Sequence, residues 1–285
     1  IAILLSTLLI AVGINFLPRS KIDAPYLIMS LTTGLSMMLL LCTISFYVFH
    51  NSVGGSIIMI ILSIVGFVRL YNLRCNVIIE NQGHLTLLIS LSLLIFFYIF
   101  CNVFYQEGHI FTDRYHDWMV HLDIGYNIRS RGLPIMDKVI FHFGLPTIIA
   151  AISEIFRINI YKASIIIALI SIILLPLITW HLISGFKLPN RIRIFASITP
   201  LLWGGLYLPY DILRLLNDPT AMNLVYIFDP LFNYPPYDVD KARLQLSGTL
   251  YHNLTQLLSV TLIASFLLTY NAFVIHKKKS LFLVS

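Results

Sequence analysis

Three side chains in the segment 112–134 have the types and the spacing of a chemical site. Asp113, Asp117 and His121 follow one another at intervals of four residues, so in a helix they share one face. Three interpretations fit. The residues are solvated on the wet face of an interfacial helix, or they bind Mg²⁺ or Mn²⁺, for which no fourth ligand is evident. In the third, an aspartate or the histidine is a general base that takes a proton from a hydroxyl.

The helix that carries these residues has a second, apolar face. Aromatic and aliphatic side chains recur there at intervals of three or four, namely Tyr115, Trp118, Met119, Leu122 and Tyr126. Such a face suits a helix that lies in the headgroup layer of a membrane. The sequence Gly132-Leu-Pro134 predicts the end of the helix.

The composition of the chain indicates what kind of protein holds this helix. The 285 residues are 58% hydrophobic and 11% charged, and the mean hydropathy is +0.85. Soluble domains carry about 25% charged residues, so a soluble globular protein, a disordered chain and a disulfide-stapled secreted domain are excluded. Cys42, Cys75 and Cys101 lie in or beside apolar runs and form no disulfide or metal-binding pattern. We predict a polytopic, all-α integral membrane protein.

Seven apolar runs are predicted to cross the membrane, since a crossing helix needs about 20 apolar residues. They are residues 1–17, 26–50, 53–71, 85–105, 163–186, 194–210 and 250–276. An eighth run, 140–156, contains His142, Pro146 and Glu154, and we predict that it lies along the outer interface instead. His181 falls inside a predicted span, where we expect a neighbouring helix to satisfy it.

The placement of charges predicts the orientation of the chain. Short cytoplasmic loops collect Lys and Arg, and seven spans put three basic groups and a triple lysine on one side: Arg19 and Lys21; Arg74; Lys187, Arg191 and Arg193; and Lys277, Lys278 and Lys279. Eleven of the 13 acidic residues then lie in the outer segments 106–162 and 211–249. The net charge of +6 is explained by this asymmetry, and no nucleic-acid partner is predicted.

This orientation divides the chain into three regions. Residues 1–105 form the first group of transmembrane helices, and residues 106–162 form an extracytoplasmic loop with juxtamembrane helices and the chemical residues. Residues 163–285 form further transmembrane helices, interrupted by the second outer loop at 211–249. We predict a multi-pass protein of the plasma membrane or the endoplasmic reticulum.

Part of the chain resembles a known superfamily. The stretches Asp117-Trp-Met-Val-His121 and Ile128-Arg-Ser-Arg-Gly132-Leu-Pro134 resemble the first extracytoplasmic loop of GT-C superfamily glycosyltransferases. The run Phe141–Phe156 and the following span, which opens with Lys162-Ala-Ser164, extend the resemblance to residues 113–202. It implies that an acidic residue of the loop is a base or metal-associated carboxylate, that two juxtamembrane helices follow, and that the donor is a polyprenyl-phosphate sugar. Asp117 is the best match to this acid and Asp113 the second.

A transferase of this kind also needs cations for the donor phosphate, which arginine binds with two parallel hydrogen bonds. The candidate substrate-binding residues are Arg129, Arg131, His142, Lys241, Arg243 and His252. For each cation the alternative is an interfacial side chain that extends its charge to the headgroups.

The expected activity is therefore transfer of a sugar from a polyprenyl-phosphate donor to an acceptor hydroxyl outside the cytoplasm. Asp117 would be the base, with Asp113 and His121 assisting. No cofactor is predicted, and a divalent metal is left open. The expected partners are membrane lipid, the donor and other membrane subunits. The rival interpretation is a non-catalytic subunit or a lipid-linked glycan carrier, which should have ionisable residues within its spans.

Overall fold

The computed structural model describes residues 1–17, 22–49, 53–72, 82–99, 116–131, 144–202 and 254–276. These residues form helices and no strand, which confirms the all-α class for this part of the chain. The α-helices are α1 (Ala2–Ile14), α2 (Ala24–Phe49), α3 (Val53–Asn72), α4 (Gln82–Ile99), α5 (His116–Arg131), α6 (Gly144–Ile155), α7 (Ile160–Leu182), α8 (Asn190–Leu202) and α13 (Leu254–His276). A 3₁₀ helix, η3 (Ile183–Phe186), follows α7.

Three helices in the described residues are long and apolar enough to cross a membrane. They are Ala24–Phe49 in α2, Val53–Tyr71 in α3, and Ile160–Phe186 in α7 and η3. Their length and composition indicate a membrane-associated protein. The other four predicted spans also coincide with helices, namely α1, α4, α8 and α13. In three of them the stretch whose side chains are described is too short to qualify as a span, namely Ala2–Ile14, Gln82–Phe97 and Leu258–Tyr270, so the number of seven spans stays a prediction.

Helices α1, α2 and α3 approach one another so closely that only glycine fits at the contacts. A Cβ atom added to Gly34 of α2 would lie 1.9 Å from the carbonyl oxygen of Leu9 in α1. One added to Gly66 of α3 would lie 1.8 Å from the carbonyl oxygen of Ala11, also in α1. Backbone atoms cannot move aside as a side chain does, so the glycines set the spacing of this three-helix unit.

An arginine on α3 satisfies the carboxyl end of α1. The Arg69 guanidinium donates from Nη1 to the carbonyl oxygen of Ile14 at 2.7 Å and from Nη2 to that of Leu17 at 3.0 Å. The last carbonyls of a helix have no partner within it, and a cation there also interacts favourably with the helix dipole.

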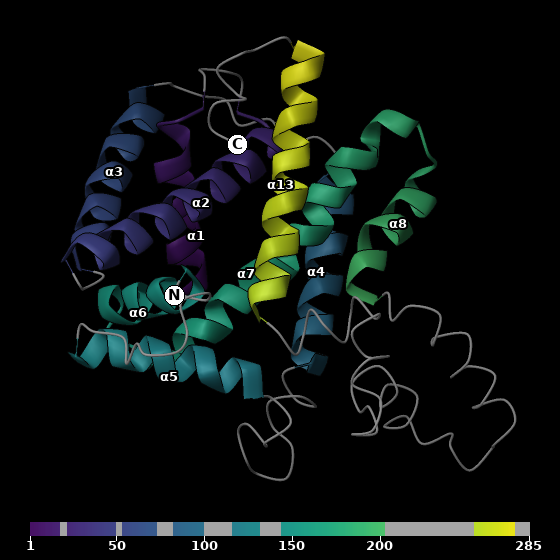
Figure 1. The fold of residues 1–285 in the computed structure, drawn as a ribbon. Coiled ribbons are helices and arrows are strands. Elements are labelled where there is room, and N and C mark those ends of the chain that lie inside the picture. The colour runs from purple at the N-terminus through teal and green to yellow at the C-terminus, as the bar shows by residue number, and fades with distance from the viewer. Residues whose placement is uncertain are drawn as a thin grey trace, which may run out of the picture.

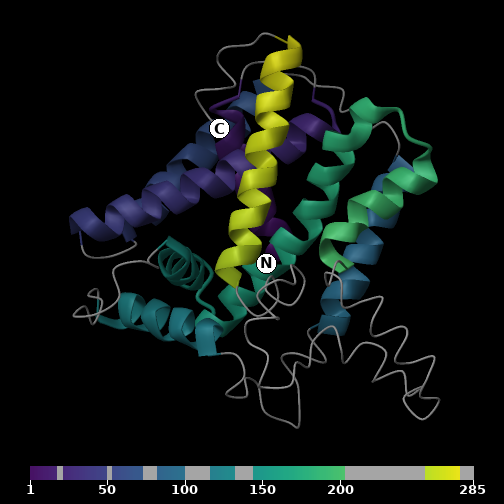
Figure 2. The same ribbon diagram turned by 45° about the vertical axis from the view of Figure 1, so that its right-hand side comes forward.

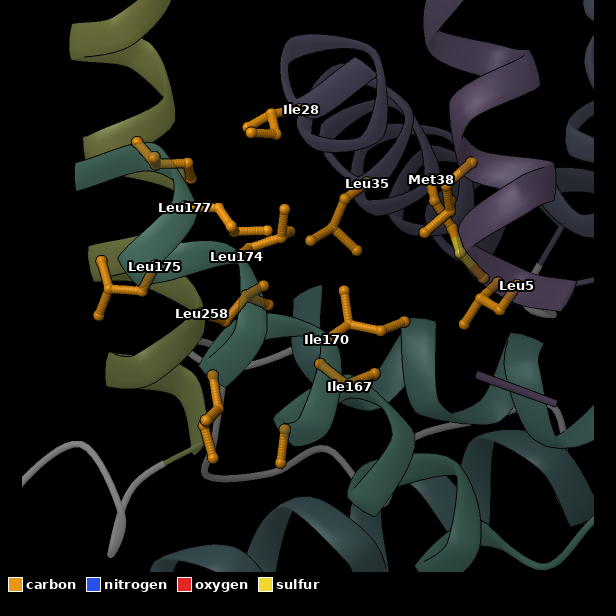
Figure 3. Packing of buried hydrophobic residues seen from close by; sticks show 14 of the residues in the cluster. Leu5, Ile28, Leu35, Met38, Ile167, Ile170, Leu174, Leu175, Leu177 and Leu258 are labelled. Carbon is orange, nitrogen blue, oxygen red and sulfur yellow. The ribbon is translucent and has the colours of Figure 1, made fainter. Parts of the chain in front are cut away.

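The main apolar core lies between α2, α7 and α13. Figure 3 shows Leu35 of α2 facing Ile170 and Leu174 of α7, with Leu258 of α13 beside α7. All four side chains are buried. Cys42 is a buried member of the same cluster and carries a free thiol, in keeping with its interpretation as a small apolar residue.

Helices α5 and α6 lie across one end of the bundle. In Figures 1 and 2 both run crosswise to α13, and α6 packs between α5 and the helices α2 and α7. With 12 residues, α6 is about 18 Å long at about 1.5 Å per residue, shorter than the ~30 Å hydrocarbon layer. Its side chains from Leu145 to Ser153 are buried. The apolar character of the run 140–156 is thus explained by protein contacts, whereas the sequence predicted an interfacial surface.

Candidate functional site

The face of α5 that packs on the bundle is the one that contains His121. The His121 side chain is only 4% exposed, and Gly125 and Ile128, one and two turns later, are buried as well. A Cβ added to Gly125 would lie 3.4 Å from the carbonyl oxygen of Pro146, which shows how near α5 lies to α6. The interpretation of His121 as a solvated residue is therefore wrong.

The opposite face of α5 is open. Asp123 and Arg129 are exposed, and Tyr126, which belongs to the predicted apolar stripe, is 60% exposed. Leu122 of the same stripe is partly buried against the main core. The two residues of the predicted apolar stripe whose side chains are described, Leu122 and Tyr126, therefore differ in burial, and the face with the candidate histidine packs against protein.

Most of the other candidate residues lie outside what the structure describes. Asp117 and Arg131 belong to α5, and only their backbone is described. The remaining candidates, Asp113, His142, Lys241, Arg243 and His252, lie outside the described residues. Of the candidates on α5 whose side chains are described, His121 lies on the packed face and Arg129 on the exposed face. The structure does not bring these two side chains together.

Arg129 connects α5 to the turn between α6 and α7. Its Nη1 donates to Ser153 Oγ at 2.5 Å and to the carbonyl oxygen of Ile158 at 2.8 Å. The Ser153 hydroxyl donates in turn to the same carbonyl, at 2.5 Å. Arg129 is nevertheless exposed, and its hydrogen bonds within the described part of the chain use only its Nη1 group. The sequence identified the arginine but not Ser153 or Ile158.

The turn that receives Arg129 has a well-defined backbone. Arg157 adopts a left-handed conformation with a φ of 50°. The Ile158 amide donates to the Ser153 carbonyl at 3.0 Å, and the Arg157 amide donates to the Glu154 carbonyl at 3.3 Å. These two bonds form a Schellman motif that ends α6. Asn159 then begins α7, with its side-chain oxygen accepting from the Lys162 amide at 2.7 Å.

A second polar cluster lies at the other end of α7, and the sequence analysis did not predict it. Arg193 of α8 donates from Nε and Nη2 to the carbonyl oxygen of Trp180, at 3.0 and 2.9 Å. Its Cζ atom also lies 3.7 Å from the centre of the Trp180 ring. His84 of α4 stacks on the same indole, with ring centroids 5.6 Å apart. Burial lowers the pKa of the Arg193 guanidinium.

His181 follows Trp180 and differs from its prediction. Among the described residues, its buried Nε2 atom has no hydrogen-bond partner, although a neighbouring helix was expected to provide one. Arg193 and Asp23 interact electrostatically with it. Ionisable side chains from α4, α7 and α8 thus meet at this end of the bundle.

No group of three or more potential metal ligands occurs among the described residues. Two side chains of the proposed set, Asp113 and Asp117, lie outside them, so the metal alternative for this set stays open.

Comparison of the chain with protein-family models, with curated proteins and with solved structures finds no match. The resemblance to the GT-C superfamily therefore depends on the loop residues described above.

Proposed function

We propose that the protein is a membrane glycosyltransferase that moves a sugar from a polyprenyl-phosphate donor to an acceptor hydroxyl on the extracytoplasmic side. The observation that carries this proposal is the position of α5. The helix that contains Asp117 lies across one end of the bundle, and Arg129 is exposed on it. A lipid-linked substrate needs a carboxylate and a cation at the membrane surface, and α5 contains both, 12 residues apart.

The membrane orientation belongs to the same proposal. We place α5 and α6 outside, with seven spans and the amino terminus outside. The orientation is supported by the sequence, in which 11 of the 13 acidic residues fall in the segments 106–162 and 211–249, since basic residues favour the cytoplasmic side.

The proposed reaction breaks one bond and forms one. Asp117 accepts the proton of the acceptor hydroxyl, and the hydroxyl oxygen attacks the anomeric carbon of the donor sugar. The bond from that carbon to the phosphate oxygen breaks, and the electron pair leaves with the polyprenyl phosphate. Arg129, with Arg131, Lys241 and Arg243 as further candidates, stabilises the charge that develops on the phosphate. His121, buried one turn after Asp117, positions the base.

A lipid-linked glycan carrier or non-catalytic subunit is the second candidate function. One observation favours it. His181, whose Nε2 atom is buried and has no partner among the described residues, lies in a helix long enough to cross a membrane. It follows Trp180, whose carbonyl binds the partly buried cation Arg193. Ionisable groups in such positions are typical of proteins that move a polar substrate.

Replacing Asp117 tests the transferase proposal. Asp117→Asn keeps the size of the side chain but cannot accept the proton, and general-base assistance contributes about 10²–10⁴-fold. We expect transfer from a radiolabelled polyprenyl-phosphate sugar in membranes to fall by that factor. Asp113→Asn should give an intermediate loss.

Asp123→Asn is the matched control, since Asp123 is an exposed carboxylate on the same helix. It should keep full activity, with expression of all variants compared by immunoblot. Full activity in Asp117→Asn would remove this residue from the mechanism. Full activity in the Asp113/Asp117 double variant would exclude the transferase proposal, and the carrier would then be preferred.

A further inference from the structure

The turn between α7 and α8 combines exposed cations with exposed apolar side chains. Lys187 and Arg191 are both exposed. Large apolar side chains lie on either side of them, with Phe186 73% and Phe195 69% exposed. We call Phe186, Lys187, Leu188, Arg191, Ile192 and Phe195 the corner patch. With the exposed phenyl rings of Phe186 and Phe195, the corner patch is more apolar than an ordinary solvated surface.

The corner patch lies at one end of the bundle. Figures 1 and 2 both show the turn between α7 and α8 projecting at the end of the bundle that is opposite α5. The chain reaches this turn by way of Ile160–Phe186, one of the helices long enough to cross a membrane. The patch therefore begins where the longest apolar helix of the described residues ends.

Within the part of the chain that the structure describes, no ion pair compensates the charge of the patch. No Asp or Glu occurs between Glu154 and Asp211 in the sequence. Among the described residues, Lys187 and Arg191 form no ion pair, whereas the nearby Arg193 is engaged with Trp180. The two exposed cations are thus available to a ligand, and the ligand they attract is an anion.

The backbone directs these cations away from the bundle. Lys187 has a left-handed conformation with a φ of 50°, which turns the chain out of η3. Arg191 and Phe195 are one turn apart on α8 and both exposed, so they share its outer face. Arg193, which lies between them in sequence, is partly buried against Trp180 on the inner face. The packing of Arg193 therefore fixes which way Arg191 and Phe195 point.

We propose that the corner patch binds the headgroup of an anionic phospholipid. Lys187 and Arg191 contact the phosphate, and Phe186, Ile192 and Phe195 lie against the acyl chains just beneath it. Basic and aromatic side chains on one surface are the composition of an interfacial element, and each cation near an anionic surface strengthens binding. This proposal does not depend on the glycosyltransferase proposal, because it uses no residue of α5.

Native mass spectrometry of the purified full chain tests it. The probes are dioleoyl phosphatidylglycerol and dioleoyl phosphatidylcholine, added at equal concentrations. The patch should retain phosphatidylglycerol in preference to phosphatidylcholine. The variant Lys187→Gln/Arg191→Gln should bind phosphatidylglycerol at least about fivefold more weakly, with phosphatidylcholine unchanged. Circular dichroism checks the helix content, and the two single variants provide the same test if the double variant misfolds.

The matched control is Arg157→Gln/Lys162→Gln, which removes two exposed cations from the other end of α7. It should keep the preference for phosphatidylglycerol. An equal loss in both double variants would show an effect of net charge alone and overturn the proposal, as would unchanged binding in the corner-patch variant. Displacement of the lipid by inorganic phosphate at equal concentration would assign the patch to a soluble anion and overturn it too.

Discussion

The two ends of α7 use an arginine from a neighbouring helix in different ways. At the amino end, Arg129 of α5 donates from one nitrogen to Ser153 and Ile158, and its side chain is exposed. At the carboxyl end, Arg193 of α8 donates from two nitrogens to Trp180 and lies over the indole ring. Arg129 ties α5 to α6 and to the turn before α7, whereas Arg193 ties α8 to α7, and of the two only Arg129 is exposed.

This difference indicates that Arg193 has a structural role, whereas Arg129 is placed where it can contact a substrate. Arg193 satisfies a carbonyl in the last turn of α7, where the helix offers no partner, and its stacked position leaves little access to a ligand. At the other end, the Ile158 carbonyl already accepts from the Ser153 hydroxyl, so Arg129 adds to a bond that exists without it. We infer that the carboxyl end depends on its arginine for stability and that the amino end can use its arginine on a substrate.

The largest effect on stability is expected for Arg193→Met. This change keeps the apolar length but removes two charged hydrogen bonds to one carbonyl, worth about 1.5–3 kcal/mol, and a cation–π contact worth about 0.5–1 kcal/mol. The free energy of unfolding in mixed detergent micelles should fall by about 2–4 kcal/mol. Arg193→Lys, which keeps the charge and a single donor group, should lose less.

Arg191→Met is the control for this prediction, because Arg191 is exposed on the same helix. Exposed positions usually change stability by less than about 0.5 kcal/mol. Equal stabilities for the variants at 191 and 193 would mean that the contacts to Trp180 do not hold α8, and the proposed difference between the two ends would be lost.

A smaller loss of stability, about 1 kcal/mol, is expected for Arg129→Met. The Ser153 hydroxyl still satisfies the Ile158 carbonyl, so no buried acceptor is left without a partner. Under the transferase proposal, activity should fall more than stability, by at least about tenfold, since one charged contact to a phosphate is worth that factor. Both quantities are measured on the same preparations.

Ser130→Ala is the neighbouring control, because Ser130 is exposed and its hydroxyl only donates to the Tyr126 carbonyl within α5. A loss of stability for Arg129→Met as large as that for Arg193→Met would contradict the comparison. Unchanged sugar transfer in Arg129→Met would leave the arginine with a structural role alone.

The sequence predicted the helices well because apolar length is a local property. Each predicted apolar run overlaps a helix among the described residues, and α3 begins at the predicted residue, Val53. The run 140–156 was set apart from the spans by its short apolar length; its helix α6 has 12 residues, and its placement along the membrane stays a prediction. Its burial was not predicted, because composition does not distinguish contact with lipid from contact with protein.

The candidate sites were harder to predict because partners come from distant parts of the chain. Spacing placed His121 on one face of α5 but could not show that α6 and α7 cover that face. The cluster of Trp180 and Arg193 joins residues 13 apart, and His84 comes from another helix altogether. Arg191 and Arg193 have the same charge and the same place in the sequence pattern, and only packing separates an exposed cation from a stacked one.

The smallest effect concerns a feature that the two ends share. Arg157 and Lys187 both have a φ of 50°, a conformation that costs an L-residue about 1–2 kcal/mol. Glycine avoids this cost but loses about 0.5–1 kcal/mol through the entropy of the unfolded chain. Arg157→Gly and Lys187→Gly should therefore each raise the free energy of unfolding by up to about 1 kcal/mol.

Alanine at the same positions distinguishes the backbone effect from loss of the cation. Arg157→Ala and Lys187→Ala remove the charge but keep the strained φ, so neither should gain stability. Matching gains for the two glycine variants, measured in the same micelles, would show that the turns themselves are equivalent and that the ends of α7 differ through their arginines. If the free energy of unfolding rose for Arg157→Gly and fell for Lys187→Gly, the backbones of the two turns would differ. That result would contradict the inference that the ends of α7 differ through their arginines.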